Sequence, residues 1–384
     1  MVQSEQPRVY FHIGAPKTGT TYLQRVLHEN RPALRRAGLL YPGTQHAHFW
    51  ASQDLREKKF RGHVDAHVRG SWDRLVKEIK GWPGRSVIDH ESFAAANREA
   101  IDRALSDLDF AEVHLVFTAR DLARQLPAAW QERIKNGSTA GYAEFLASVR
   151  AEGADREMAA KHFWAMQGVP TVLARWSRNI PPEHVHVVTV PPAGAEPGLL
   201  WRRFAGLLEL DPDAFDSSAR GANTSLGAAE AAVLRRFNTS IADLDVPWPA
   251  YAEVFKQRLA PALAERAGDP IELPEEYFNW AVERSEHIAA ELSAAGYSVV
   301  GDLAELVPTT RPIGVNPDDV PADARAEAAL AGMVSMVALV ADSRVATTAV
   351  RRSQRGPVAR KFEEIVGRTP ALGRLRDSFR ARRG

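Results

Sequence analysis

The first residues whose types could do chemistry form a glycine-bracketed loop, "GAPKTGTT", at residues 14–21. The apolar run from Arg8 to Gly14 predicts a β-strand, and residues 21–37 carry apolar side chains at helical spacing. A loop between a strand and a helix points its backbone N–H groups into one concavity, to which the helix N-terminus adds partial positive charge. The loop therefore predicts a phosphate-binding site.

Each residue type in this loop suits a phosphate. Glycines let the backbone turn tightly and approach an anion, threonine hydroxyls can donate to phosphate oxygens, and one lysine brings positive charge. The lysine stands out because the 49 basic residues comprise 9 lysines against 40 arginines. The candidate binding residues are Pro16, Lys17, Thr18, Gly19, Thr20 and Thr21.

The lysine is displaced relative to the common ATP-binding loop. In that pattern, G-x-x-x-x-G-K-[ST], the lysine follows the second glycine and reaches the β- and γ-phosphates. Here Gly14 and Gly19 keep the separation, but Thr20 stands in the lysine position and Lys17 comes three residues after the first glycine. The cation is therefore aimed at a different part of the ligand.

The segment "PKTGTT" after a strand resembles the 5′-phosphosulfate loop of sulfotransferases that use 3′-phosphoadenosine 5′-phosphosulfate (PAPS), and "GAPKTGTTYLQ" resembles their bacterial members. The resemblance implies an α/β fold with a P-loop-like phosphosulfate-binding loop. It also implies that Lys17 contacts the oxygen between sulfonate and 5′-phosphate, where it would stabilise the departing phosphate. The implied reaction moves a sulfonate from PAPS to a hydroxyl of a small-molecule, carbohydrate or glycolipid acceptor. It leaves 3′-phosphoadenosine 5′-phosphate (PAP) and uses no metal.

The family reads the 3′-phosphate with an arginine at the end of a later strand and a serine eight residues on. Arg120, which follows the predicted strand at residues 114–118, matches the arginine. The serine position holds Ala128, so another donor must replace the hydroxyl, and Arg124 is the candidate. Pro127 predicts a break in the helix that follows.

A basic loop often closes over the nucleotide in this family. The segment "ARGANTS" before a predicted helix offers Arg220 and Asn223 for that role, and Thr224 or Ser225 as the N-cap of the helix. We therefore include Arg220 and Asn223 among the candidate nucleotide-binding residues.

Transfer to a hydroxyl also requires a base that removes its proton. The segment "YPGTQHAHFW" lies where carbohydrate-type members of the family carry a base glutamate, and it supplies His46 and His48 instead. The segment "IDHESF" supplies His90 and Glu91 after a second predicted strand. We rank His46 first, followed by Glu91, His48 and His90.

Two other classes of function compete with this interpretation. A nucleotide or small-molecule kinase with a variant P-loop is favoured by "SVID", whose aspartate imitates a magnesium ligand, and is opposed by the displaced lysine. A non-catalytic binding module could be built around the C-terminal arm. Magnesium dependence and ATP binding distinguish the kinase.

Strand patterns at residues 8–14, 86–89, 114–118 and 184–190 alternate with helical patterns, which predicts a central, mostly parallel sheet flanked by helices. The sequence predicts an α/β domain at residues 1–306, a Pro-rich linker at 307–323 and a helical extension with a basic tail at 324–384. Further helices are predicted at residues 139–151, 199–208, 226–238, 280–296 and 324–350.

Composition excludes several classes. The chain of 384 residues is 45% hydrophobic and 25% charged, as in soluble globular proteins, and its net charge of +1 gives no reason to expect a nucleic-acid partner. It has no cysteine, so disulfides and thiolate nucleophiles are excluded. The first residues lack a signal-peptide pattern, and the apolar run at residues 328–341 is too short to span a bilayer, so we expect a cytoplasmic protein.

The C-terminal arm is the one strongly charged segment. Residues 350–384 carry 11 basic and 3 acidic side chains, a net charge of +8. Such a tail could make weak contact with an anionic membrane surface, or it could be a solvated end.

Overall fold

The fold was analysed in a computed structural model that describes residues 6–57, 66–151, 158–218, 225–244, 246–266 and 268–353. The chain divides into two compact units, Met1–Ala328 and Ala329–Gly384. The first holds the sheet and most helices, and the second continues the last helix. Arg220 and Asn223 lie outside the described residues.

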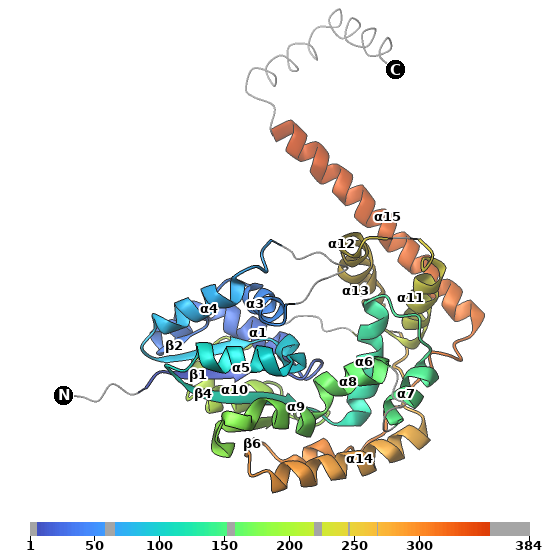
Figure 1. Ribbon diagram of the computed structural model, residues 1–384. Helices are drawn as coiled ribbons and strands as arrows, with labels where there is room; N and C mark the ends of the chain where they lie inside the picture. Colours follow the sequence, from blue (N-terminus) through green and yellow to red (C-terminus); the bar gives the residue numbers. More distant parts are fainter. Residues whose placement is uncertain are drawn as a thin grey trace, which may run out of the picture. The chain divides into compact units, whose positions relative to one another are not determined.

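A central sheet of six parallel strands, flanked by helices, forms the core of the first unit, so the predicted α/β class is confirmed (Figure 1). The strand order is β2-β3-β1-β4-β5-β6. The strands are β1 Arg8–His12, β2 Leu39–Leu40, β3 Arg85–Asp89, β4 Glu112–Ala119, β5 Val185–Thr189 and β6 Ser298–Val300.

Helices follow nearly every strand, and a helical layer extends beyond the sheet (Figure 1). The helices are α1 Thr20–Glu29, α2 Arg31–Arg36, α3 Ala47–Leu55, α4 Ser71–Lys80, α5 Arg98–Asp107, α6 Leu122–Lys135, α7 Tyr142–Arg150, α8 Met158–Gln167, α9 Val169–Trp176, α10 Leu199–Leu207, α11 Ala228–Ser240, α12 Trp248–Tyr251, α13 Ala260–Ala264, α14 Glu275–Ala294 and α15 Ala322–Ser353. A π-helical stretch, Ala252–Leu259, joins α12 to α13.

Strand β1 is apolar on both faces because helices cover both sides of the sheet. Tyr10 packs in a buried cluster with residues of α1 and α10. Its neighbour Phe11 points to the opposite face, where its ring centroid lies 6.0 Å from that of Trp72, 4.8 Å from that of Phe93 and 5.0 Å from that of Trp176. This two-sided burial explains why the sequence shows a continuous apolar run at β1.

The strand order places β1 between β3 and β4. The chain therefore adds β2 and β3 on one side of β1 and then crosses to add β4, β5 and β6 on the other side. In open parallel sheets such a switch point is where ligands bind, beyond the carboxyl ends of the strands. Three segments of interest start there: residues 14–19 after β1, His90 and Glu91 after β3, and Arg120 after β4.

The predicted break at Pro127 is wrong, because α6 runs without interruption from Leu122 to Lys135. A proline inside a helix removes one backbone hydrogen bond. Here the Asp121 carboxylate caps the helix by accepting from Arg124 N at 2.9 Å, and Leu126 and Trp130 are fully buried. Tertiary packing and the cap outweigh the lost bond.

The Pro-rich segment at residues 307–323 lies within the first compact unit. Val315 pairs with Ile271 in a parallel bridge, and its N–H donates to the carbonyl of Pro270 at 2.9 Å. The Asp318 carboxylate accepts from the backbone N–H of Ala143, at the start of α7, at 2.9 Å. These bonds hold the segment against the helical layer.

Candidate functional site

A pocket of about 810 Å³ lies at the carboxyl ends of β1, β3 and β4. The loop after β1, the segment after β3, Arg120 after β4 and one face of α6 all line it, so this pocket lies at the switch point of the sheet. The lining residues are Pro16, Lys17, Gly19, Thr20, Thr21, Phe49, His90, Glu91, Ser92, Arg120, Arg124, Ala128, Ala129, Gln131, Glu132, Arg133, Lys135, Asn136, His162, Phe163, Met166, Gln167, Val190, Ser225 and Lys256.

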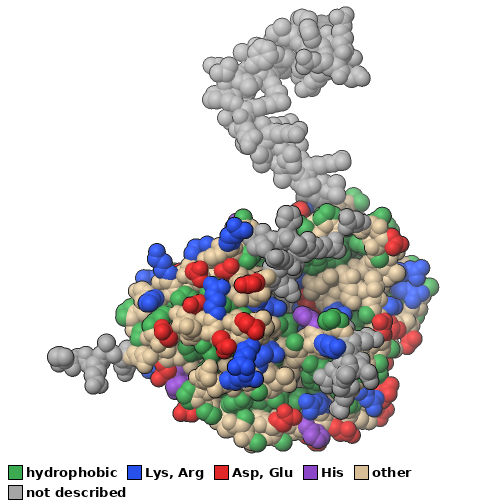
Figure 2. All heavy atoms as spheres, in the orientation of Figure 1, with side chains coloured by type: hydrophobic (Ala, Val, Ile, Leu, Met, Phe, Trp, Pro, Cys, Tyr) green, Lys and Arg blue, Asp and Glu red, His purple; other side chains and the backbone are tan. Residues whose placement is uncertain are grey.

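The pocket is strongly cationic although the chain has a net charge of only +1. On the outer face seen in Figure 2, Lys and Arg side chains are interspersed with Asp and Glu. Among the described residues, two acidic ones line the pocket, Glu91 and Glu132. Six described basic residues line it, Lys17, Arg120, Arg124, Arg133, Lys135 and Lys256. Such a site favours a ligand with several negative charges.

The loop after β1 needs glycine at its first position. Gly14 has a φ of +118°, and a Cβ built on it would lie 3.0 Å from the Cβ of Glu91. The loop is held to β4 because Ala15 N donates to the carbonyl of Thr118 at 2.9 Å. The Arg120 guanidinium adds a second tie by donating to the carbonyl of Lys17 at 3.1 Å.

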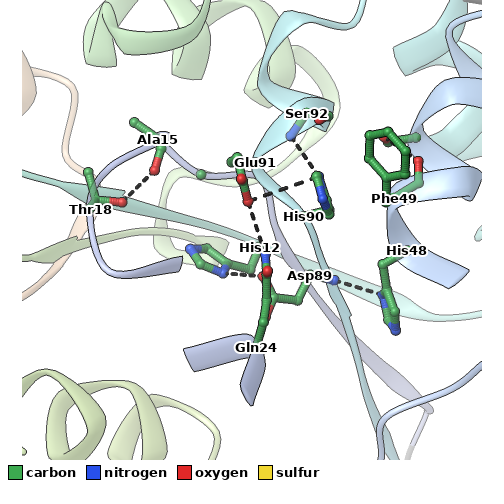
Figure 3. Close-up of polar contacts among 12 residues, drawn as sticks. His12, Ala15, Thr18, Gln24, His48, Phe49, Asp89, His90, Glu91 and Ser92 are labelled. Atoms are coloured by element: carbon green, nitrogen blue, oxygen red, sulfur yellow. Dashed lines mark hydrogen bonds and ion pairs between the residues drawn. The ribbon is translucent and has the colours of Figure 1, made fainter. Parts of the chain in front are cut away.

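A buried polar network supports the loop from below (Figure 3). His12 Nδ1 lies 2.8 Å from the carboxylate of Asp89, and His12 Nε2 lies 3.1 Å from the hydroxyl of Thr118. Thr18 Oγ1 lies 2.5 Å from that same hydroxyl and 2.5 Å from the carbonyl of Ala15, to which it donates. Thr18 therefore shapes the loop from inside and does not line the pocket, unlike Thr20 and Thr21.

The Lys17 ammonium is held by a carboxylate on α6. Lys17 Nζ lies 2.6 Å from one oxygen of Glu132, and Lys256 Nζ lies 3.0 Å from the other. Lys256 also donates to the side chain of Asn136 at 2.8 Å. Burial alone would raise the pKa of Glu132, but the two ammonium groups outweigh it and lower that pKa to about 2. Glu132 is therefore ionised at neutral pH and bridges two cations.

The two arginines at the start of α6 differ in how they are used. Arg120 keeps a buried Nε atom that has no hydrogen-bond partner among the described residues. Burial, together with the charge of Arg124, lowers the pKa of Arg120 to about 10, so it stays protonated at neutral pH. Arg124 bonds Asp121 and donates to the carbonyl of Pro191 at 3.0 Å. Within the described part of the chain, the Arg120 side chain makes one hydrogen bond and the Arg124 side chain makes three, so more of the Arg120 guanidinium is available to a ligand.

Glu91 is a carboxylate that faces the pocket beside the loop (Figure 3). Gln24 of α1 donates to its Oε2 at 3.0 Å. Burial acts to raise the pKa of Glu91, but His90 and several hydrogen bonds prevail and hold it below its usual value. His90 Nδ1 accepts from the backbone N–H of Ser92 at 3.0 Å, so the neutral ring carries its proton on Nε2.

The two histidines before β3 do not reach the pocket. His48 is 2% exposed, donates from Nε2 to the carbonyl of Pro42 at 2.9 Å, and accepts at Nδ1 from Asp89 N at 3.1 Å. Burial is the main cause that lowers the pKa of His48 to about 4. His46 is exposed at the start of α3, beside Trp50. Among the four candidate bases, His90 and Glu91 line the pocket, and His46 and His48 do not.

Ala128, which we placed at the serine position, lines the pocket and offers no donor there. Several other pocket residues were not predicted from the sequence. Glu132, Lys135 and Lys256 also line it, although none follows a strand. The scarcity of lysine was the one signal that could have drawn attention to Lys135 and Lys256, and nothing in the sequence marks Glu132.

Comparison with known proteins adds no relative. No protein-family model matches the chain, no curated protein matches it, and no solved structure matches it. What the pocket can do follows from its own residues.

Proposed function

We propose that the protein is a sulfotransferase that moves a sulfonate group from PAPS to a hydroxyl of a small-molecule, carbohydrate or glycolipid acceptor. The observation that carries the proposal is the meeting of Lys17, Arg120 and Glu91 in one cationic pocket at the switch point of the sheet. The pocket volume of about 810 Å³ is within the range of small-molecule sites. The positive charge suits a nucleotide with phosphate groups at both its 3′ and 5′ positions.

The proposed roles follow from the positions of the side chains. Backbone N–H groups of residues 17–19 and the start of α1 bind the 5′-phosphosulfate. Lys17 neutralises the departing 5′-phosphate, and the Arg120 guanidinium, which lines the pocket, contacts the 3′-phosphate. Thr20 and Thr21 supply hydroxyl donors from the first turn of α1.

PAPS supplies a sulfonate joined to a phosphate leaving group. In the proposed step, the acceptor oxygen forms a bond to sulfur as the bond from sulfur to the 5′-phosphate oxygen breaks, and that electron pair leaves on PAP. The acceptor proton passes to a carboxylate, and no atom changes its oxidation state. Lys17 stabilises the charge that develops on the leaving oxygen.

Glu91 is the base that the pocket supports best. It lies next to the loop, since a Cβ added to Gly14 would meet it at 3.0 Å. Its lowered pKa keeps it ionised at neutral pH, so it can accept a hydrogen bond from the acceptor hydroxyl, and Gln24 fixes one of its oxygens. His46 and His48, which we ranked first and third, have no comparable access to the pocket.

The surroundings of Asp89 remove the main support for the kinase alternative. A kinase needs a carboxylate that holds magnesium beside the phosphates. The Asp89 side chain is fully buried, contacts His12 and does not line the pocket. A sulfotransferase has no such requirement.

Calorimetry with PAP and with ATP, in excess chelator and again with magnesium, tests the proposal. We expect PAP to bind at least tenfold more tightly than ATP, and Lys17→Ala to weaken PAP binding. The variant Lys77→Ala, which removes an exposed lysine, is the matched control and should leave PAP binding unchanged. Tighter binding of ATP that depends on magnesium would favour the kinase and contradict the proposal.

The second unit supports a separate proposal, that the C-terminal arm makes weak contact with an anionic lipid surface. Apolar side chains 59–70% exposed follow one face of α15 at helical spacing. They are Leu330, Met333, Val334 and Val337. The net charge of +8 that follows at residues 350–384 complements anionic lipid. None of the described helices is long and apolar enough to cross a bilayer, so the contact would be interfacial.

Flotation with anionic and neutral vesicles tests the lipid contact. The full chain should float with anionic vesicles and much less with neutral ones. Deletion of residues 351–384 should abolish that difference. If the shortened chain floats with anionic vesicles as well as the full chain does, the tail has no such role.

A further inference from the structure

Three lysines of the pocket gather around a single carboxylate. Lys17 and Lys256 bind the two oxygens of Glu132 at 2.6 and 3.0 Å. Lys135 follows Glu132 by three residues on α6, so both face the same side of the helix, and it lines the same pocket. These are three of only nine lysines in a chain with 40 arginines.

The carboxylate does not balance the charge of this group. Three ammonium groups against one carboxylate leave a net charge of +2 in a partly enclosed space. Burial lowers the pKa of Lys135, and the charges of Lys17 and Lys256 lower it further while Glu132 opposes them. Like charges that repel one another in this way would be relieved by a bound anion.

Glu132, Lys135 and Lys256 lie on the far side of Lys17 from Arg120, the residue assigned to the nucleotide. Arg120 bonds the carbonyl of Lys17, the Lys17 ammonium bonds Glu132, and Glu132 bonds Lys256. Helix α6 contacts the loop near its start, where Gln125 donates to the carbonyl of Pro16 at 2.5 Å. Lys135 comes ten residues later, about 15 Å further along the helix axis.

We propose that Lys135 and Lys256 form an anion subsite for the sulfonate acceptor, which is therefore an anionic alcohol, a hydroxyl compound that also carries a carboxylate, phosphate or sulfate group. This inference rests on the proposed function and narrows its substrate class. A sulfonate that lies at Lys17 has the nucleotide on the side of Arg120 and the acceptor on the side of Lys256. Glu132 offsets part of the positive charge of the subsite when no acceptor is bound.

Three sugars that share hydroxyl groups but differ in charge serve as probes: glucose, glucuronate and glucose 6-phosphate. Binding of each is measured by saturation-transfer NMR or calorimetry, with the full chain alone and with the full chain saturated with PAP. We expect the two anions to bind at least tenfold more tightly than glucose under both conditions. Comparing glucuronate with glucose 6-phosphate distinguishes a carboxylate from a phosphate as the preferred group.

Two variants assign the binding to the subsite. Lys135→Gln and Lys256→Gln should each weaken binding of the preferred anion at least tenfold, with PAP affinity changed less than threefold. Lys161→Gln, which alters an exposed lysine on α8, is the matched control and should change neither affinity. Circular dichroism establishes that all three variants are folded.

Two results would overturn the inference. One is binding of glucose as tight as that of both anions. The other is a loss of PAP affinity in Lys256→Gln with anion binding unchanged, which would give the lysines to the nucleotide. A wild-type chain that binds no PAP would contradict the proposed function instead. Anion binding that Lys256→Gln abolishes would in that case still assign the subsite, as an anion site without the role of sulfonate acceptor.

Discussion

Replacing Glu132 with glutamine is expected to destabilise the protein and, at the same time, to tighten its binding of PAP. Glu132 binds Lys17 and Lys256 at 2.6 and 3.0 Å, so its charge stabilises the free protein. The same charge repels any phosphate that approaches Lys17. Glu132→Gln removes both effects and keeps the shape of the side chain.

The stability change follows from the pKa of Glu132, which is about 2 against an ordinary value of 4.5. Each pKa unit corresponds to about 1.4 kcal/mol, so the ionised form gains about 3 kcal/mol in the folded state. Because the folded pKa is lowered, this stabilisation is present above pH 4.5 and is lost as the pH falls toward 2. Glu132→Gln should therefore cost up to about 3 kcal/mol at pH 7.

The change in binding follows from the Lys17 contact. A phosphate oxygen that accepts from Lys17 Nζ at about 2.8 Å lies no more than about 5.4 Å from the Glu132 oxygen, which is itself 2.6 Å from Nζ. Two unit charges at that separation repel by about 3 kcal/mol at an effective dielectric constant of about 20. Salt and partial exposure reduce the effect, so we expect a gain of about tenfold in PAP affinity, or about 1.4 kcal/mol.

Calorimetry with PAP at pH 7.5 and urea unfolding at pH 7 and pH 4 measure the two effects. Glu209→Gln, which alters an exposed carboxylate paired with Arg8 and Arg85, is the control for loss of an ion pair outside the pocket. PAP binding that is unchanged or weaker in Glu132→Gln would refute the reasoning. So would equal stability of the variant and the wild-type protein at pH 7.

Three further predictions concern the loop, the second anchor and the pH dependence of stability. Gly14→Ala places a Cβ 3.0 Å from that of Glu91 at a φ of +118°, so urea unfolding should show a loss of about 1–3 kcal/mol; an unchanged midpoint would contradict the assigned strain. Arg120→Ala should raise the KM for PAPS and reduce discrimination against adenosine 5′-phosphosulfate, which competition kinetics would show; equal losses for both nucleotides would count against a 3′-phosphate contact. His48 has a pKa of about 4 against an ordinary 6.5, so the unfolded chain protonates first and about 3 kcal/mol of stability should be lost as the pH falls from 6.5 to 4. His48→Gln should flatten that part of the curve, and an equally steep curve would show that other groups cause it.

The four interior strands could be predicted because each carries its own apolar, β-branched run. Strands β2 and β6 were missed, since Leu39–Leu40 and Ser298–Val300 are too short to show any pattern. Their pairing is set by β3 and β5 beside them. The break predicted at Pro127 failed for the opposite reason. The local signal of the proline was strong, but the cap and the packing of α6 outweigh it.

Part of the pocket could be predicted from the positions of the strands. Segments that follow parallel strands meet at one edge of the sheet, and Lys17, Glu91 and Arg120 all follow strands. Glu132 and Lys256 come from helical segments whose position depends on tertiary packing, which the sequence does not display. His48 resembled a base in sequence, and only the fold reveals that both its ring nitrogens are bonded to backbone groups.

A crystal structure of the protein soaked with PAP tests the central claim most directly. The account predicts the 5′-phosphate against the backbone N–H groups of residues 17–19, with an oxygen within hydrogen-bond distance of Lys17 Nζ and the 3′-phosphate at Arg120. PAP bound at any other surface, with the pocket filled by solvent alone, would contradict the account.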